Sequence, residues 1–95
     1  MTGVLEKQLA RALDVRLAVF THKAADGSLL RDEMSLRAAA LVASEIILPC
    51  CCQLCNKAKL ENLLAQTKLC ANNAELTQRL AALVYDDLAR CNGLG

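Results

Sequence analysis

The sequence predicts an all-α protein, either a bundle of three to four antiparallel helices or a stack of helical hairpins. Hydrophobic residues make up 55% of the 95 residues, which is too large a share for a disordered chain. Most of them are Leu and Ala, which favour helices, and Phe20 and Tyr85 are the two aromatic residues. With one proline and four glycines, few residues interrupt a helix. An aliphatic core suits close packing between helices, so we expect a single helical domain over residues 1–95.

The first predicted helix covers residues 4–24, where apolar residues recur at helical spacing. Its expected buried face carries Leu5, Leu9, Ala12, Leu13, Val19 and Phe20. Arg16 projects into this apolar sector, which is a local inconsistency. Asp26, Gly27 and Ser28 then predict a turn, and the Ser28 hydroxyl can cap the following helix by accepting from an exposed backbone amide.

The second predicted helix covers residues 29–48 and changes character along its length. Its first half is charged, whereas residues 38–48 are apolar almost all round. A helix that is apolar on every side needs cover on every side, and a domain of this size can hardly provide it. We therefore expect either a central helix or a contact surface for another protein chain. The expected contact residues are Leu41, Val42, Ile46, Ile47 and Leu48.

The third predicted helix covers residues 50–70 and follows Pro49. Proline either opens a new helix after a tight turn or kinks one long helix. We favour two helices, because proline suits the first turn of a helix. The stripe expected to face the core contains Asn56, Leu60, Leu63, Leu64, Thr67 and Cys70.

The fourth predicted helix covers residues 74–91. Asn72 and Glu75 have the spacing of a capping box at its start. Asn92 and Gly93 supply the left-handed residue that commonly ends a helix. Its expected buried face contains Leu76, Leu80, Leu83, Val84 and Cys91.

One ion pair is predicted between the first and fourth helices. Asp87 falls in the middle of the apolar face of the fourth helix, as Arg16 does on the first. We expect these two residues to pair across the core, or each to pair with a partner protein, because a charge inside an apolar face needs an opposite charge.

Four of the six cysteines lie within residues 50–55, directly after Pro49. Free cysteine behaves as a small hydrophobic residue, so close packing where the second and third helices meet is the preferred interpretation. Zinc binding by Cys51, Cys52 and Cys55 is an alternative. It lacks a second closely spaced pair to complete the four ligands that a structural zinc ion needs.

The same cysteines leave two further chemistries open. A Cys-x-x-Cys motif at a helix start can hold a reactive thiolate, and Cys52 and Cys55 have that spacing. The usual setting of that motif includes a β-strand, which this sequence does not predict. S-acylation of Cys50, Cys51 and Cys52 would attach the protein to a membrane beside an apolar helix.

Several classes of function are disfavoured by composition. The net charge is +1, with 11 basic and 10 acidic residues interspersed, so no basic patch predicts nucleic-acid binding. Residues 38–48 fall short of the ~20 apolar residues that a transmembrane helix needs. Glu6 and Asp14 argue against a targeting peptide, since such peptides are poor in acids. We expect an intracellular, cytoplasmic protein with reduced thiols.

No catalytic constellation is apparent in the sequence. His22 is the single histidine, and the adjacent acid pairs at 32–33 and 86–87 diverge on a helix rather than converge. We therefore expect a non-enzymatic binding subunit, adaptor or assembly chaperone without a cofactor, which acts on a protein partner or a second copy of itself. The alternative is a thiol-based metal-binding or redox protein centred on residues 50–55.

Overall fold

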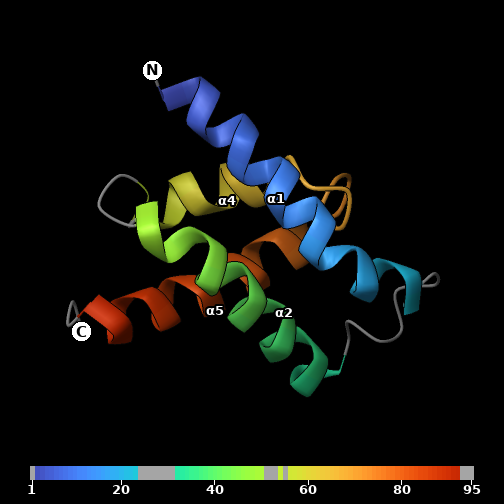
Figure 1. The fold of residues 1–95 in the computed structure, drawn as a ribbon. Coiled ribbons are helices and arrows are strands. Elements are labelled where there is room, and N and C mark those ends of the chain that lie inside the picture. The colour runs from blue at the N-terminus through green and yellow to red at the C-terminus, as the bar shows by residue number, and fades with distance from the viewer. Residues whose placement is uncertain (1, 24–31, 51–53, 55, 93–95) are drawn as a thin grey trace.

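The computed structural model describes residues 2–23, 32–50, 54 and 56–92 (Figure 1). In these ranges all regular structure is helical, as the sequence predicts. The elements are α1 (Thr2–Lys23), α2 (Glu33–Ile47), the short 3₁₀ turn η2 (Leu48–Cys50), α4 (Lys57–Ala65) and α5 (Ala74–Asn92).

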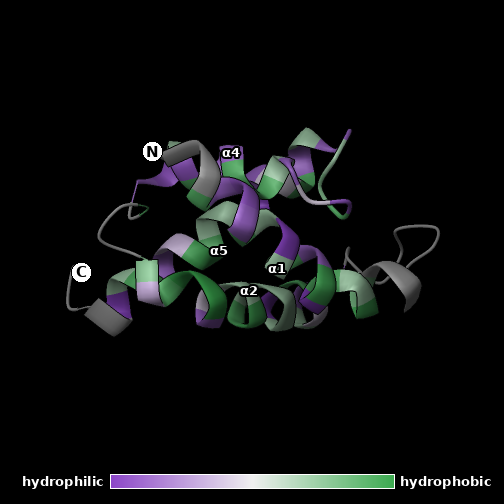
Figure 2. Cartoon of the chain, turned by 45° about the horizontal axis from the view of Figure 1, so that its top comes forward, coloured by the Kyte–Doolittle hydropathy of each residue, from purple (hydrophilic) through white to green (hydrophobic). Residues whose placement is uncertain are grey.

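The helices are arranged around α5, which packs against both α2 and α4. α1 runs beside α2 and also contacts α4 (Figure 1). Hydrophobic and hydrophilic residues alternate along each helix, as expected where one face is buried and the other meets water (Figure 2). None of the helices in the described ranges combines the length and the apolar character that crossing a bilayer requires.

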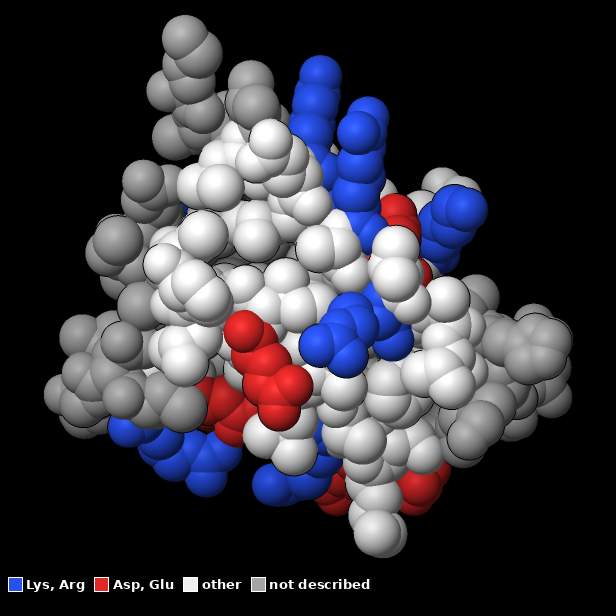
Figure 3. All heavy atoms as spheres, in the orientation of Figure 1, with Lys and Arg blue, Asp and Glu red and all other residues white. Residues whose placement is uncertain are grey.

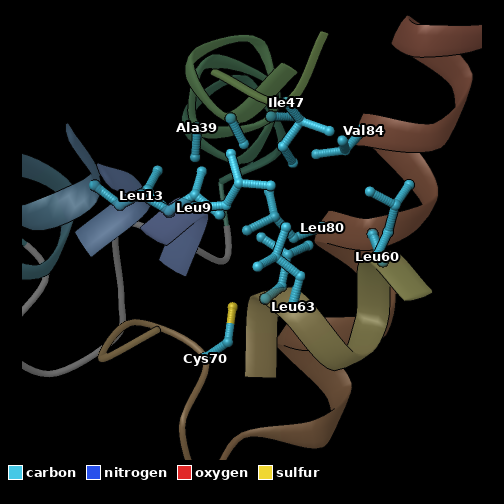
Figure 4. Close-up of a cluster of buried hydrophobic side chains, with 14 of the residues drawn as sticks. Leu9, Leu13, Ala39, Ile47, Leu60, Leu63, Cys70, Leu80 and Val84 are labelled. Atoms are coloured by element: carbon cyan, nitrogen blue, oxygen red, sulfur yellow. The ribbon is translucent and has the colours of Figure 1, made fainter. Parts of the chain in front are cut away.

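A single aliphatic core joins the four helices. Figure 4 shows side chains from all of them meeting: Leu9 and Leu13 of α1, Ala39 and Ile47 of α2, Leu60 and Leu63 of α4, and Leu80 and Val84 of α5. Leu54 and Cys70, which lie outside these helices, are buried in the same cluster. Several of the side chains that α2 buries are alanines, so the neighbouring helices approach it closely.

The predicted buried face of α1 is partly wrong. Leu9 and Leu13 are buried as expected, but Ala12 and Val19 are exposed. Leu17, which the prediction omitted, is almost fully buried. The buried residues of α1 centre on the i,i+4 row Leu9, Leu13 and Leu17, with Ala10 beside it. Leu5 and Phe20 are partly buried and pack against the core, as predicted. The covered sector is therefore shifted from the predicted one, and Ala12 and Val19 lie beyond its edge. Arg16, at that edge, is exposed to water.

The start of α2 is later than predicted. Asp32 has an extended backbone, and its carboxylate accepts from the Ser35 backbone amide at 3.4 Å and from the Ser35 hydroxyl at 3.1 Å. A carboxylate in this position satisfies a free amide of the first turn, so α2 begins at Glu33 rather than at residue 29. The predicted turn at residues 26–28, with its Ser28 cap, lies outside the described residues.

The helix predicted over residues 50–70 is shorter than expected at both ends. Pro49 lies inside η2, Leu54 has a helical backbone, and α4 begins at Lys57. Asn56 cannot belong to the helix, since its backbone is extended and its side chain accepts from the Ala58 amide at 2.8 Å. α2 and α4 are therefore separate helices, as favoured over one kinked helix. Residues 51–53 and 55 lie outside the described part.

The C-terminal end of α4 is closed by a threonine. The amide of Gln66 already donates to the Leu63 and Leu64 carbonyls, which tightens the last turn. The buried Thr67 hydroxyl then donates to the Leu64 carbonyl at 2.6 Å and accepts from the Cys70 amide at 3.3 Å. A side chain that bonds to backbone groups in this way competes with the helix ladder, so α4 ends and a series of turns leads to α5.

The bounds of α5 agree with the prediction to within one residue, but its capping residue is one position later than predicted. Asn72 has a φ of 66°, a left-handed conformation that Asn tolerates better than most residues. Asn73 is the capping residue, because its side-chain oxygen accepts from the Leu76 amide at 3.1 Å. α5 ends at Asn92, one residue after the predicted end, and Gly93 lies outside the described residues.

The buried face of α5 is confirmed for three of its five predicted residues, namely Leu76, Leu80 and Val84. Leu83 is only partly buried. The side chain of Cys91 lies outside the described part of the chain. The rest of the face is made by Thr77, Ala81 and Leu88.

We expect Leu63→Ala to lower the free energy of unfolding by about 3 kcal/mol, because it removes a fully buried side chain and leaves a cavity. Urea denaturation followed by circular dichroism measures this loss. Val15→Ala is the matched control, since Val15 is 77% exposed and its truncation should change the stability by less than about 0.5 kcal/mol. Equal losses for the two variants would contradict the core described above.

Replacing the cap of α5 by Asn73→Ala should cost about 1 kcal/mol, because the Leu76 amide loses its acceptor. The same denaturation assay applies. Asn62→Ala is the control at an exposed position inside α4, where alanine is the better helix former and the stability should stay the same or rise slightly. An unchanged stability for Asn73→Ala would show that the cap contributes nothing.

Candidate functional site

The five residues predicted to contact a partner lie in three different environments. Ile47 is fully buried in the core. Val42 and Ile46 are partly buried and pack against that core. Leu41 and Leu48 are 56% and 38% exposed, so they alone present substantial apolar surface to water.

Helix geometry explains why these neighbouring residues differ in burial. α2 packs against α1 and against α5, and each neighbour covers one side. Residues seven apart point in nearly the same direction after two turns. Leu41 and Leu48 therefore share the uncovered side, and so does Met34, which is 78% exposed. We call Met34, Leu41 and Leu48 the α2 stripe.

Met34 was missed by the sequence analysis because it lies among the charged residues of the first half of α2. The signal that could have found it is its spacing of seven residues before Leu41 and fourteen before Leu48. Such a repeat is typical of helices that pack against another helix along a seam.

A groove runs beside the α2 stripe, between α2 and α5. It consists of two adjoining hollows of about 540 Å³ and 420 Å³, which share Leu41, Asp87 and Arg90 as lining residues. We call them together the α2–α5 groove. Its lining also includes Arg37, Ala40, Ser44, Glu45, Leu48, Leu83, Asp86 and Ala89. Leu41 and Leu48 belong both to the stripe and to the groove, so the two form one continuous surface.

Polar groups at the bottom of the groove bond to each other. The buried Ser44 hydroxyl oxygen lies 2.8 Å from the Ala40 carbonyl oxygen and 3.3 Å from Asp87 Oδ2, so its single proton serves one of these acceptors or is shared. Asp87, whose side chain is 13% exposed, also forms a salt bridge with Arg90. These polar groups have hydrogen-bond partners within the chain. An apolar side chain of another molecule could therefore fill the groove without leaving a buried polar group unsatisfied.

The predicted pairing of Arg16 with Asp87 is wrong. Asp87 lies on the α2 side of α5, where it bonds to Ser44 and Arg90, whereas Arg16 is exposed on α1. Arg90 is three residues after Asp87 on the same helix, which is a natural spacing for an ion pair. The sequence pattern showed that Asp87 needed a partner, and a closer one was available on its own helix.

Charges of both signs surround the groove. On α2, Arg37 pairs with Glu33 at 3.7 Å, and the two side chains are 62% and 73% exposed. Glu45 and Asp86 are exposed at other points of the groove. Figure 3 shows basic and acidic side chains close together over the lower part of the face it draws, with uncharged surface between them. Exposed ion pairs of this kind are weak, so they can rearrange when another chain approaches.

Zinc binding, redox chemistry and S-acylation at residues 50–55 stay predictions, because most of these cysteines lie outside the described part of the chain. Cys51, Cys52 and Cys55 lie outside the described residues, and Cys50 is partly exposed at the end of η2. In the ranges that the structure covers, no three His, Cys, Asp or Glu side chains come together as metal ligands.

Cys70 has the environment of a structural residue. It is almost fully buried in the aliphatic core (Figure 4). Its backbone carbonyl accepts from the Thr77 hydroxyl at 3.2 Å. Burial raises the pKa of the Cys70 thiol, and hydrogen bonds with Thr67 and Thr77 oppose this rise without cancelling it. A buried protonated thiol packs as a small hydrophobic group and is a poor nucleophile.

The raised pKa of Cys70 predicts a loss of stability in alkali. The ordinary thiol value is 9.0, so above that pH the thiol ionises in the unfolded chain before it does in the folded one. The contribution of Cys70 to the free energy of unfolding is therefore complete below pH 9.0 and falls as the pH rises through the folded pKa. Urea unfolding of the wild type and of Cys70→Ala over this range isolates the effect, because the other titrating groups are common to both. A constant difference between the two proteins would contradict the prediction.

Comparison with known proteins does not extend these observations. We find no match to this chain among family models, curated proteins or solved structures. Inferences about function therefore rest on the surface that the chain itself presents.

Proposed function

We propose that this protein is a non-enzymatic helical binding subunit, of the adaptor or assembly-chaperone type, that binds a protein chain through the α2 stripe and the α2–α5 groove. The observation that carries the proposal is the line of exposed Met34, Leu41 and Leu48 beside a groove whose polar floor is internally satisfied.

The energetics of this surface favour association. Apolar area removed from water stabilises a complex by roughly 25 cal/mol per Å², before the costs of association are subtracted. Leu41 lies at the centre of the stripe and lines both hollows, which is where the residues that dominate binding usually lie. An apolar helix face seated in a groove between two helices is a common mode of protein recognition.

The composition of the groove supports binding rather than catalysis. Among the described residues that line it there is neither cysteine nor histidine. The one hydroxyl, Ser44, already lies against the Ala40 carbonyl and Asp87, and Asp87 is held by Arg90. A nucleophile would need a free base beside it, and the carboxylate here is engaged in an ion pair.

The proposal predicts that a photoreactive amino acid at position 41, in the full chain expressed in its native cells, forms a covalent adduct of discrete mass with a protein. Position 15 is the matched control, because Val15 is likewise an exposed aliphatic residue on a helix but lies on α1. An excess of unlabelled wild-type chain should compete the adduct at position 41. Adducts of equal yield at both positions, or none at position 41, would refute the proposed surface.

A further inference from the structure

We propose that the chain bound by the α2–α5 groove is a second copy of this protein, docked with its α2 antiparallel and with a twofold axis passing beside Leu41. This inference rests on the proposed function, since it names the partner for the same surface.

The spacing of the α2 stripe is self-complementary. Met34 lies seven residues before Leu41, and Leu48 lies seven residues after it. In an antiparallel pair centred on Leu41, the two Leu41 side chains meet each other, and Met34 meets Leu48 of the second copy at both ends. Each of these contacts lies about 10 Å from the centre, at ~1.5 Å per residue. Every exposed apolar side chain of the stripe thus finds an apolar neighbour.

The charges beside the stripe select the antiparallel orientation. Arg37 and Ser44 flank the stripe on the side toward α5, since Arg37 lines the groove and Ser44 contacts Asp87. Ala38 and Glu45 lie on the other side of Leu41 by their helical spacing, and Glu45 reaches the groove only at its outer rim, beside Leu41 and Leu48. A twofold axis perpendicular to both helices brings each flank against the same flank of the second copy.

In that arrangement a basic residue meets an acidic site. Arg37 lies four residues before Leu41 and Ser44 three after it, so Arg37 comes level with Ser44 of the second copy. Ser44 contacts Asp87, and the charged residues that α5 contributes to the described groove lining are two acids (Asp86, Asp87) and one base (Arg90). Arg37 can leave its exposed pair with Glu33 and bond to the Asp87 carboxylate.

The charges on the outer flank, and the charges that a parallel pair would bring together, also favour the antiparallel orientation. Across the outer flank, Glu45 faces the small Ala38 of the second copy, so no like charges meet there. A parallel pair would instead bring the flank that carries Asp87 against the flank that carries Glu45, and two carboxylates would repel each other. Charge complementarity therefore favours a second copy in the antiparallel register.

A charge-swap experiment tests the arrangement. Analytical ultracentrifugation of the purified full chain, in a reducing agent that excludes disulfide-linked dimers, should give twice the chain mass of 10.2 kDa at micromolar and higher concentrations. Arg37→Asp and Asp87→Arg should each weaken dimerisation at least tenfold, since like charges then face each other at both ends of the interface. An equimolar mixture of the two variants should recover the dimer, because both contacts in the mixed pair again join an acid with a base.

Two further variants keep the result decisive if Asp87→Arg does not fold, which circular dichroism would show. Leu41→Asp changes a 56% exposed side chain at the twofold axis and should give a folded monomer. Val15→Asp, at an exposed site on α1, should leave the dimer intact. A dimer that survives Leu41→Asp, or Arg37→Asp and Asp87→Arg variants that both fold but do not recover the dimer when mixed, would overturn the inference.

A wild type that is monomeric at all concentrations would also overturn it, and the adduct at position 41 then separates the two proposals. An adduct with a different protein would leave the proposed function standing with a foreign partner. The absence of any adduct at position 41 would refute both the dimer and the proposed function.

Discussion

The close approach of α2 to its neighbours is the constraint on which the rest of the described structure depends. The chain has almost no aromatic side chains, so its core can be filled only if helices come near one another. Ala39, Ala40 and Ala43 are almost completely buried on α2, as is Ala81 on α5. Small side chains let the backbones approach, and the surrounding leucines of α1, α4 and α5 then meet in one cluster.

The same constraint produces the candidate site. A helix held closely by α1 on one side and by α5 on another has one uncovered side, and along the middle of that side runs the α2 stripe, flanked by exposed Arg37, Ala38 and Glu45. Beside that side, residues of α2 and α5 line the α2–α5 groove. Ser44 and Asp87 hold the floor of the groove together by a contact between the two helices. Packing and binding surface therefore share one element, and substitutions of Ser44 or Asp87 would affect both.

The proposed dimer would cover the side of α2 that faces water in the single chain. A twofold interface uses the same surface on both copies, so the α2 stripe of one copy buries its apolar area against the α2 stripe of the other. The exposed Arg37–Glu33 pair contributes little by itself and so costs little to break when Arg37 finds Asp87 of a second copy. Cys70 takes no part in this surface, since it is buried between the end of α4 and the start of α5.

The sequence by itself determined the helical class, the position of α5 and the aliphatic character of the core, because helix propensity, periodicity and capping are local properties. It also indicated that α2 has more apolar surface than a small domain covers. Tertiary structure alone decided that Ile47 is buried while Leu41 is exposed, that Leu17 replaces Val19 in the core, and that Asp87 bonds to Ser44 and Arg90 rather than to Arg16. These outcomes depend on which neighbouring helix covers which side of α1, α2 and α5, and helical periodicity within one segment carries no information about its neighbours.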